Sequence, residues 1–128
     1  MIRKIWHLLC LLLAASNVAH ADDCERPRNV FDELYCARKI FFDLDDELNR
    51  YYKLLMEELN NEQKALLKQG QLAWIKERDS SCTSVDEHGV GSVIVSCAVK
   101  TTRERLHFLQ ERCRECQTVG CMTGKLKE

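Results

Sequence analysis

The sequence has little proline and glycine, and it lacks an apolar run long enough to cross a membrane. One proline, Pro27, and five glycines occur among its 128 residues, so nothing after Pro27 forbids long helices. The apolar run 5–15 is well short of the roughly 20 residues that span a bilayer. Basic residues are not in excess, at 19 against 20 acidic ones, which argues against a nucleic-acid-binding protein.

The first 21 residues have the three parts of a cleavable secretory signal. Arg3 and Lys4 form a positive start, residues 5–15 form the apolar run, and Ala19 and Ala21 are the small residues before the cleavage site. We expect cleavage before Asp22, an exported protein, and no stable insertion in a membrane once the signal is removed. Removal of 21 residues from 128 leaves 107, a length typical of one domain with a limited core.

Cysteine, by contrast, is plentiful. Seven cysteines follow the signal: Cys24, Cys36, Cys82, Cys97, Cys113, Cys116 and Cys121. In an exported chain this density is typical of a disulfide framework, which stabilises a domain with a small core. Seven is an odd number, so at least one thiol stays free, pairs between chains or is modified.

Apolar residues spaced three and four apart predict helices. The first helix is expected over 29–59, with apolar residues at Leu34, Ala37, Phe41, Leu44, Leu48, Tyr51, Leu55 and Leu59. A second is expected over 62–80, capped by Asn61, and a third from 92 to about 113 or 115. The connections are short, so we predict an all-α fold, a small antiparallel bundle of about three helices stapled by disulfides.

Two segments lack helical periodicity. Residues 80–91 are rich in Ser, Thr, Asp and Gly and are predicted to be a loop. The β-branched run Val93-Ile94-Val95 is too short for a strand and has no evident partner, so it is assigned to the third helix. Residues 117–128 are expected to form a loose tail, which leaves 22–116 as the helical domain.

The second and third helices carry the most specific spacing. Gln71, Trp74, Arg78 and Cys82 are three, four and four residues apart and therefore share one helix face. Asp79 follows Arg78 directly. On the third helix, Thr102, Arg105 and Leu109 follow Cys97 at offsets of five, eight and twelve. The series is completed by Cys24, Cys36, Leu48, Asn49, Tyr51, Gly91 and Ser92.

This series resembles the LprI-like family of exported bacterial proteins over residues 24–109. The resemblance implies a helical, cysteine-bearing protein located in the periplasm or secreted. It also implies inhibition of lysozyme, the activity of the member that names the family. The tail with Cys113, Cys116 and Cys121 departs from the pattern, so no function is carried onto it.

Local disulfides are favoured by spacing. Cys82 and Cys97 bracket the predicted loop, and a bridge between them would join the second helix to the third. Cys24 and Cys36 are close enough in the chain to tie the N-terminal segment to the first helix. The three tail cysteines are expected to form one pair and leave one thiol, although sequence alone does not determine the connectivity.

Structural roles are expected for the motif residues. Trp74 lies on an apolar face and is predicted to be a core residue. Arg78 and Asp79 are predicted to form a buried ion pair with Arg105 that joins the second helix to the third, in preference to contacting a ligand. The acidic run 43–47 is predicted to be a solvated face, with contact to a cationic partner as the alternative.

Enzymatic chemistry is not indicated. The Cys113-x-x-Cys116 pair matches thiol oxidoreductases, but it falls at a helix C-terminus, whereas that chemistry needs a helix N-terminus. His88 and His107 are not at zinc-ligand spacing from the cysteines, and we expect no metal and no cofactor. We therefore predict a non-enzymatic protein that inhibits lysozyme by protein–protein binding and so protects the cell wall. The alternative is a periplasmic accessory protein that binds an envelope component.

Overall fold

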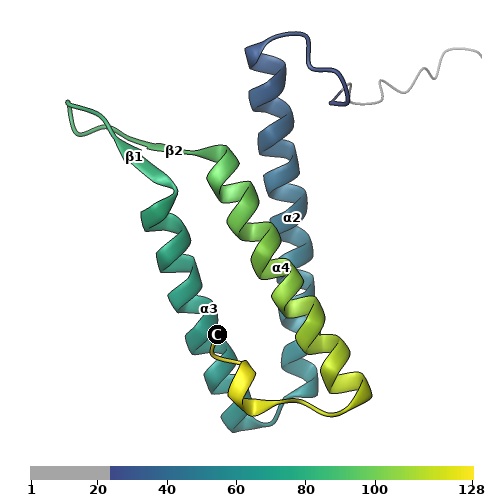
Figure 1. The fold of residues 1–128 in the computed structure, drawn as a ribbon. Helices are drawn as coiled ribbons and strands as arrows, with labels where there is room; N and C mark the ends of the chain where they lie inside the picture. The colour runs from purple at the N-terminus through teal and green to yellow at the C-terminus, as the bar shows by residue number, and fades with distance from the viewer. Residues whose placement is uncertain (1–23) are drawn as a thin grey trace, which may run out of the picture.

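Three helices form the body of the protein in a computed structural model that describes residues 24–128 (Figure 1). They are α2 (Val30–Glu58), α3 (Asn61–Ser81) and α4 (Val95–Thr118). Helix α3 runs antiparallel to α2 and α4, and α4 packs most extensively against α2. The predicted all-α bundle of three helices is confirmed. The predicted signal, residues 1–21, lies outside the described residues.

Short polar side chains fix where α2 and α3 begin. Asn29 caps α2, because its side-chain oxygen accepts a hydrogen bond of 3.0 Å from the main-chain N–H of Asp32. Asn60 caps α3 in a reciprocal box with Gln63, at 2.9 and 3.1 Å. The sequence predicted Asn61 as this cap and was wrong by one residue, since the tight connection after Leu59 holds Asn60, not Asn61, in the extended conformation that a cap requires.

The core lies at one end of the bundle and is built mainly from leucines. The buried cluster comprises Leu48, Leu55, Leu59, Leu67, Leu106, Leu109, Cys113 and Leu126. Its members on α2 all belong to the C-terminal half of that helix. At the other end of α2, Phe31, Leu34 and Tyr35 are exposed. The helical stripe read from the sequence is therefore continuous along α2, but its N-terminal end, at Leu34, stays exposed.

The segment between α3 and α4 is a β-hairpin. Strand β1 (Thr83–Val85) pairs antiparallel with β2 (Gly91–Val93), with Ser84 opposite Ser92. The prediction of a loop that leads into a helix at residue 92 was wrong here. The sequence pattern shows no partner strand for residues 93–95, but in the structure the residues just after Cys82 pair with residues 91–93. Helix α4 consequently begins at Val95 and ends at Thr118.

The C-terminal segment is packed rather than loose. Leu126 is 1% exposed and belongs to the core. A short 3₁₀ turn, η1 (Thr123–Lys125), precedes it, and the Gln63 amide donates to the Thr123 hydroxyl at 3.0 Å. Lys125 pairs with Glu115 of α4 at 2.9 Å. The sequence pattern missed this packing, because a single leucine among polar residues has no periodicity.

Gly70 allows the C-terminal segment to approach α3. A Cβ atom at this position would lie 3.1 Å from the main-chain oxygen of Lys127 and 3.2 Å from that of Leu126. Such contacts are closer than a methyl group normally makes, and main-chain atoms yield less readily than the end of a flexible side chain. A glycine within a helix ordinarily weakens it, but at position 70 the close approach of the C-terminal segment requires one.

We predict that Gly70→Ala destabilises the protein. An alanine in an exposed helix interior would raise the free energy of unfolding by up to about 1 kcal/mol, but here overpacking should lower it by about 1–3 kcal/mol. Urea unfolding measures the change. Gly124→Ala is the matched control, because nothing lies within 4 Å of a Cβ at that position. A gain in stability for Gly70→Ala would contradict the packing described.

Candidate functional site

The motif residues of α3 and α4 meet on one side of the bundle. Trp74, Arg78, Arg105 and Phe108 line a hollow of about 330 Å³ between the two helices, near Glu128. Gln71 lies beside them and is buried. The shared helix face inferred from the spacing of Gln71, Trp74 and Arg78 therefore points toward α4.

Arg105 is the most deeply buried charged group of this hollow. It is 5% exposed. Its Nε donates to Gln71 Oε1 at 2.9 Å, and its Nη1 donates to the main-chain oxygen of Glu128 at 2.6 Å. The guanidinium also lies 4.2 Å from the centre of the Phe108 ring. Burial lowers the pKa of Arg105 to about 10. Arg105 thus joins α4 both to α3 and to the C-terminal segment.

Arg78 keeps one of its predicted partners, Asp79, but its other ion-pair partner was not predicted. It pairs with its neighbour Asp79 at 2.9 Å and with Asp45 of α2 at 3.6 Å. Its guanidinium lies 4.9 Å from the centre of the Trp74 ring. The predicted joint ion pair with Arg105 does not form, because the Asp79 carboxylate is exposed and Arg105 is oriented by Gln71 instead. Arg78 connects α3 to α2 rather than to α4.

The other motif residues divide between core and surface. Leu48, Leu109 and Thr102 are fully buried. Trp74 is half-buried, at the edge of the core and on the wall of the hollow, so it is not enclosed as a core residue would be. Asn49 is exposed and donates to Asp45 at 3.2 Å.

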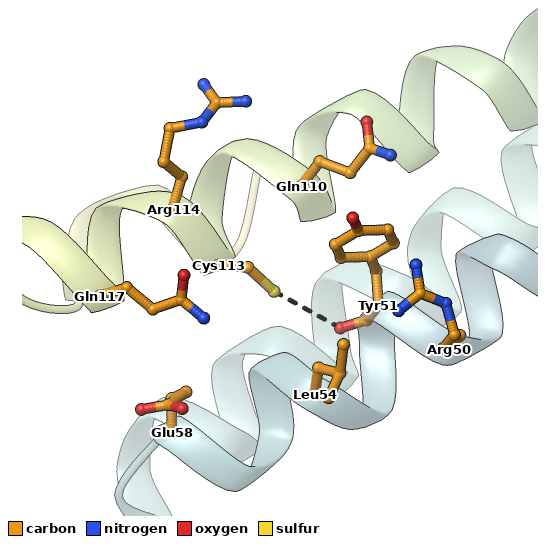
Figure 2. Close-up of a pocket in the computed structure, with 8 residues that line it drawn as sticks. All are labelled: Arg50, Tyr51, Leu54, Glu58, Gln110, Cys113, Arg114 and Gln117. Atoms are coloured by element: carbon orange, nitrogen blue, oxygen red, sulfur yellow. Dashed lines mark hydrogen bonds between the residues drawn. The ribbon is translucent and has the colours of Figure 1, made fainter.

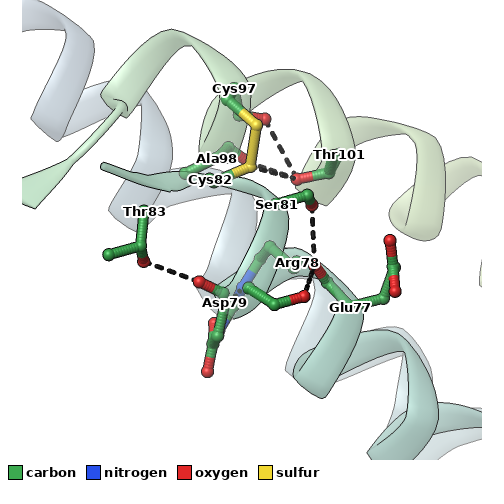
Figure 3. Close-up of a disulfide and its surroundings, with 10 residues drawn as sticks. Glu77, Arg78, Asp79, Ser81, Cys82, Thr83, Cys97, Ala98 and Thr101 are labelled. Atoms are coloured by element: carbon green, nitrogen blue, oxygen red, sulfur yellow. Dashed lines mark hydrogen bonds and ion pairs between the residues drawn. A yellow bond between two sulfur atoms is a disulfide. The ribbon is translucent and has the colours of Figure 1, made fainter. Parts of the chain in front are cut away.

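The Cys82–Cys97 disulfide closes the base of the β-hairpin (Figure 3). It spans 15 residues, and the main-chain N–H of Ile94 donates to the Cys82 carbonyl at 2.8 Å just above it. The Thr83 hydroxyl donates to the Asp79 carbonyl at 2.6 Å, which ties the start of β1 to the end of α3. The hairpin is therefore fixed to both helices at its base.

The tip of the hairpin is ordered by its own side chains and exposed to solvent. Asp86 accepts hydrogen bonds of 2.9 Å from the main-chain N–H groups of His88 and Val90. Gly89 has a φ of 78°, in the left-handed region that favours glycine. Val90 is 62% exposed. The tip thus presents an apolar side chain on a pre-formed turn.

Apolar side chains continue from the hairpin onto α2. A second hollow, of about 470 Å³, lies between β2, the start of α4 and α2, and Phe41, Phe42 and Val93 line it. Phe42 is 63% exposed. We call the exposed apolar residues of this region the hairpin surface: Phe42, Val85, Val90, Val93 and Ile94.

The acidic run of α2 is largely occupied within the protein. Asp43 pairs with Lys39 at 3.1 Å, and Asp45 pairs with Arg78. Glu47 pairs with Arg50 one turn later, and this bond lowers the pKa of the Glu47 carboxyl. Three carboxylates of the run are therefore already paired within the protein, which weakens the alternative that the run contacts a cationic partner.

Within residues 24–128, three disulfides join Cys24 to Cys36, Cys82 to Cys97 and Cys116 to Cys121. Both favoured local pairs are present, and the tail cysteines form one pair as expected. The remaining thiol of these residues is Cys113, which is buried.

Within residues 24–128 no helix is long and apolar enough to cross a membrane. No group of three His, Cys, Asp or Glu side chains in this part of the chain is placed to hold a metal ion.

Cys113 lies at the floor of a third hollow, of about 500 Å³, between α2 and α4 (Figure 2). Its Sγ points toward α2 and donates to the Tyr51 carbonyl at 3.7 Å. Burial, together with the nearby Glu58 carboxylate, raises the pKa of the Cys113 thiol. A raised pKa reduces the thiolate fraction, so the position does not favour nucleophilic chemistry.

Comparison with known proteins identifies the family of the chain. The family described as lysozyme inhibitor LprI matches residues 24–109. The chain belongs to the LprI family. An uncharacterized protein of Rhizobium meliloti (strain 1021) is 27% identical over 122 residues, which cover 81% of this chain and 88% of that one. No solved structure matches.

The LprI match ends at Leu109, four residues before Cys113. It therefore covers both local disulfides, the hairpin and all the motif residues, but not the Cys116–Cys121 bridge. By its description this is a family of inhibitors rather than of enzymes. Three disulfides also indicate an oxidising compartment.

We predict that loss of the hairpin disulfide lowers the free energy of unfolding by about 3 kcal/mol, the value expected for a closed loop of this length. The variant carries Cys82→Ser with Cys97→Ser, and urea unfolding measures it. The control is Ser84→Ala with Ser92→Ala, which removes an exposed hydroxyl pair, 2.8 Å apart, from the same hairpin. It should cost at most about 1 kcal/mol. Equal losses for the two variants would contradict the role given to the disulfide.

We predict that Cys113 is protected from alkylation in the folded protein. Iodoacetamide reacts with the thiolate form of cysteine. Because the pKa of Cys113 is raised, its rate of alkylation should still increase with pH where an ordinary thiol is already fully ionised. Peptide mapping by mass spectrometry after pulse labelling measures the modified fraction. Denaturant should remove the protection. Rapid labelling of folded protein at neutral pH would show that the thiol is accessible and ionised.

Proposed function

We propose that this protein inhibits lysozyme by protein–protein binding and that the hairpin surface makes the contact. Family membership supports the activity. The observation that supports the location is a projecting, covalently anchored hairpin whose apolar side chains are exposed. An apolar side chain in water costs free energy that burial against a partner recovers.

The shape of the hairpin suits an enzyme cleft. It stands away from the three helices at one end of the molecule (Figure 1). Its turn is fixed by Asp86 and its base by the Cys82–Cys97 disulfide. A rigid, projecting element loses little conformational entropy on binding, so more of the contact energy appears as affinity. We propose that it enters the substrate cleft of lysozyme and excludes the cell-wall polymer.

Charge at the tip is compatible with such a partner. Glu87 and His88 are both highly exposed at the tip and lie 3.6 Å apart. Lysozymes are often strongly basic, and an exposed carboxylate on an inhibitor accelerates encounter with a basic partner.

We further propose that the protein acts after export, in the periplasm or outside the cell, and that its role there is to protect the cell wall.

We predict that Val90→Glu weakens inhibition at least about tenfold, because a charge would be carried into a desolvated contact. The measurement is lysis of bacterial cell walls by lysozyme at increasing inhibitor concentration. Val119→Glu is the matched control, since Val119 is 71% exposed and follows α4 at the opposite end of the molecule. This variant should inhibit as the natural protein does.

Two outcomes would overturn the proposal in different ways. Undiminished lysis with an excess of the natural, oxidised protein would exclude lysozyme inhibition. It would favour the alternative of an accessory protein that binds an envelope component. Equal inhibition by Val90→Glu and the natural protein would leave the activity in place but exclude the hairpin tip from the interface.

A further inference from the structure

The N-terminal end of α2 exposes four large apolar side chains to solvent. Val30 is 75% exposed, Phe31 84%, Leu34 41% and Tyr35 59%. Helical residues four apart lie on the same face, so the four side chains gather on one side of α2. This end of the helix extends beyond the hairpin and the start of α4 (Figure 1). We call these four residues the α2 patch.

Local bonds hold this helix end in shape. Asn29 caps it, and the Cys24–Cys36 disulfide ties the preceding segment to α2. Cys36 is two residues from Leu34 and therefore lies on the opposite side of the helix, so the disulfide leaves the α2 patch open. Most helices in proteins owe their stability to packing of an apolar face. An ordered helix end with an exposed apolar face is therefore suited to pack against a partner.

The charges beside the α2 patch are self-complementary. Two acidic residues, Asp32 and Glu33, come before Tyr35, and two basic residues, Arg38 and Lys39, come after it. Both pairs are symmetric about a point between residues 35 and 36. In an antiparallel pair of these helix ends, the acidic residues of each copy would lie level with the basic residues of the other. A parallel pair would place like charges together, which repel each other.

The area of the α2 patch also fits contact with a second copy. Complete cover of the exposed parts of its side chains on two copies would remove about 1,000 Å² from solvent, the lower limit for a specific interface. A twofold pair uses the same patch on both copies, so no second surface is needed. An interface of this size indicates a dimer that dissociates on dilution.

We infer that two copies of this protein associate through the α2 patch, with their α2 helices antiparallel. The twofold axis lies near Tyr35. The ion pairs of Asp32 with Arg28 and of Lys39 with Asp43 are exposed, and such pairs are weak enough to rearrange on contact. No residue of the α2 patch belongs to the hairpin surface. The inference therefore does not depend on inhibition of lysozyme.

Sedimentation velocity of the natural, oxidised protein without lysozyme tests the association. We expect the average mass to rise from one chain to two between low micromolar and millimolar concentration. Phe31→Glu should weaken association at least about tenfold, because it carries a charge into a desolvated contact. Leu72→Glu is the matched control and should associate normally, since Leu72 is 58% exposed on α3. Circular dichroism checks that both variants fold, and Tyr35→Glu is the second variant on the same face.

Cross-linking tests the direction of the two helices. The variants are Leu34→Cys and Phe42→Cys, each treated with a short bis-maleimide at a concentration that favours the dimer. In the antiparallel pair, the two copies of residue 34 lie about 5 Å apart along the helix axis, and the two copies of residue 42 about 20 Å apart. We expect a cross-linked dimer with Leu34→Cys and none with Phe42→Cys. The natural protein, whose free thiol Cys113 is buried, is the control.

Four results would overturn the inference. A mass of one chain at millimolar concentration would exclude self-association, and a mass that rises beyond two chains would exclude a closed twofold pair. Equal association of Phe31→Glu and the natural protein would place the interface elsewhere. Equal cross-linking of Leu34→Cys and Phe42→Cys would show that the helices are not antiparallel.

Discussion

The leucine core at one end of the bundle is the constraint on which the rest of the structure depends. It joins the C-terminal half of α2 to α3, α4 and the C-terminal segment through residues such as Leu55, Leu67 and Leu126. Apolar burial is the dominant favourable term in folding, and a chain of this length has little of it. Where the core ends, the helices need other connections. Arg105, Arg78 and the Cys82–Cys97 disulfide supply them toward the hairpin end.

The core and the exposed apolar residues therefore lie at different ends of the molecule. The core end holds the fold, and the opposite end, where fewer residues are buried, carries the exposed hairpin and the exposed N-terminal end of α2. A disulfide close to the hairpin allows apolar side chains to remain in solvent without loss of shape. The exposed apolar side chains of the hairpin surface are not part of the buried core that holds the helices together.

The motif residues show how far sequence reasoning reaches. Their spacing correctly placed Gln71, Trp74 and Arg78 on one face, since helical geometry alone determines which residues share a face. The partners of that face were less predictable. Arg78 pairs with Asp45, more than thirty residues away, and Arg105 bonds to Gln71 and to the segment near Glu128. Long-range partners depend on how the helices are rotated against each other, which the local pattern does not specify.

The sequence by itself determined three helices and their order, favoured both local disulfides and indicated the family, because each of these depends on spacing within a short stretch of chain. Tertiary structure decided the rest. It paired β1 with β2, which were too short to recognise singly. It also buried Leu126 and brought its main chain against Gly70 of α3. It also brought Arg105 against Gln71 and Glu128, because only the packing of two helices and the C-terminal segment decides which distant groups meet.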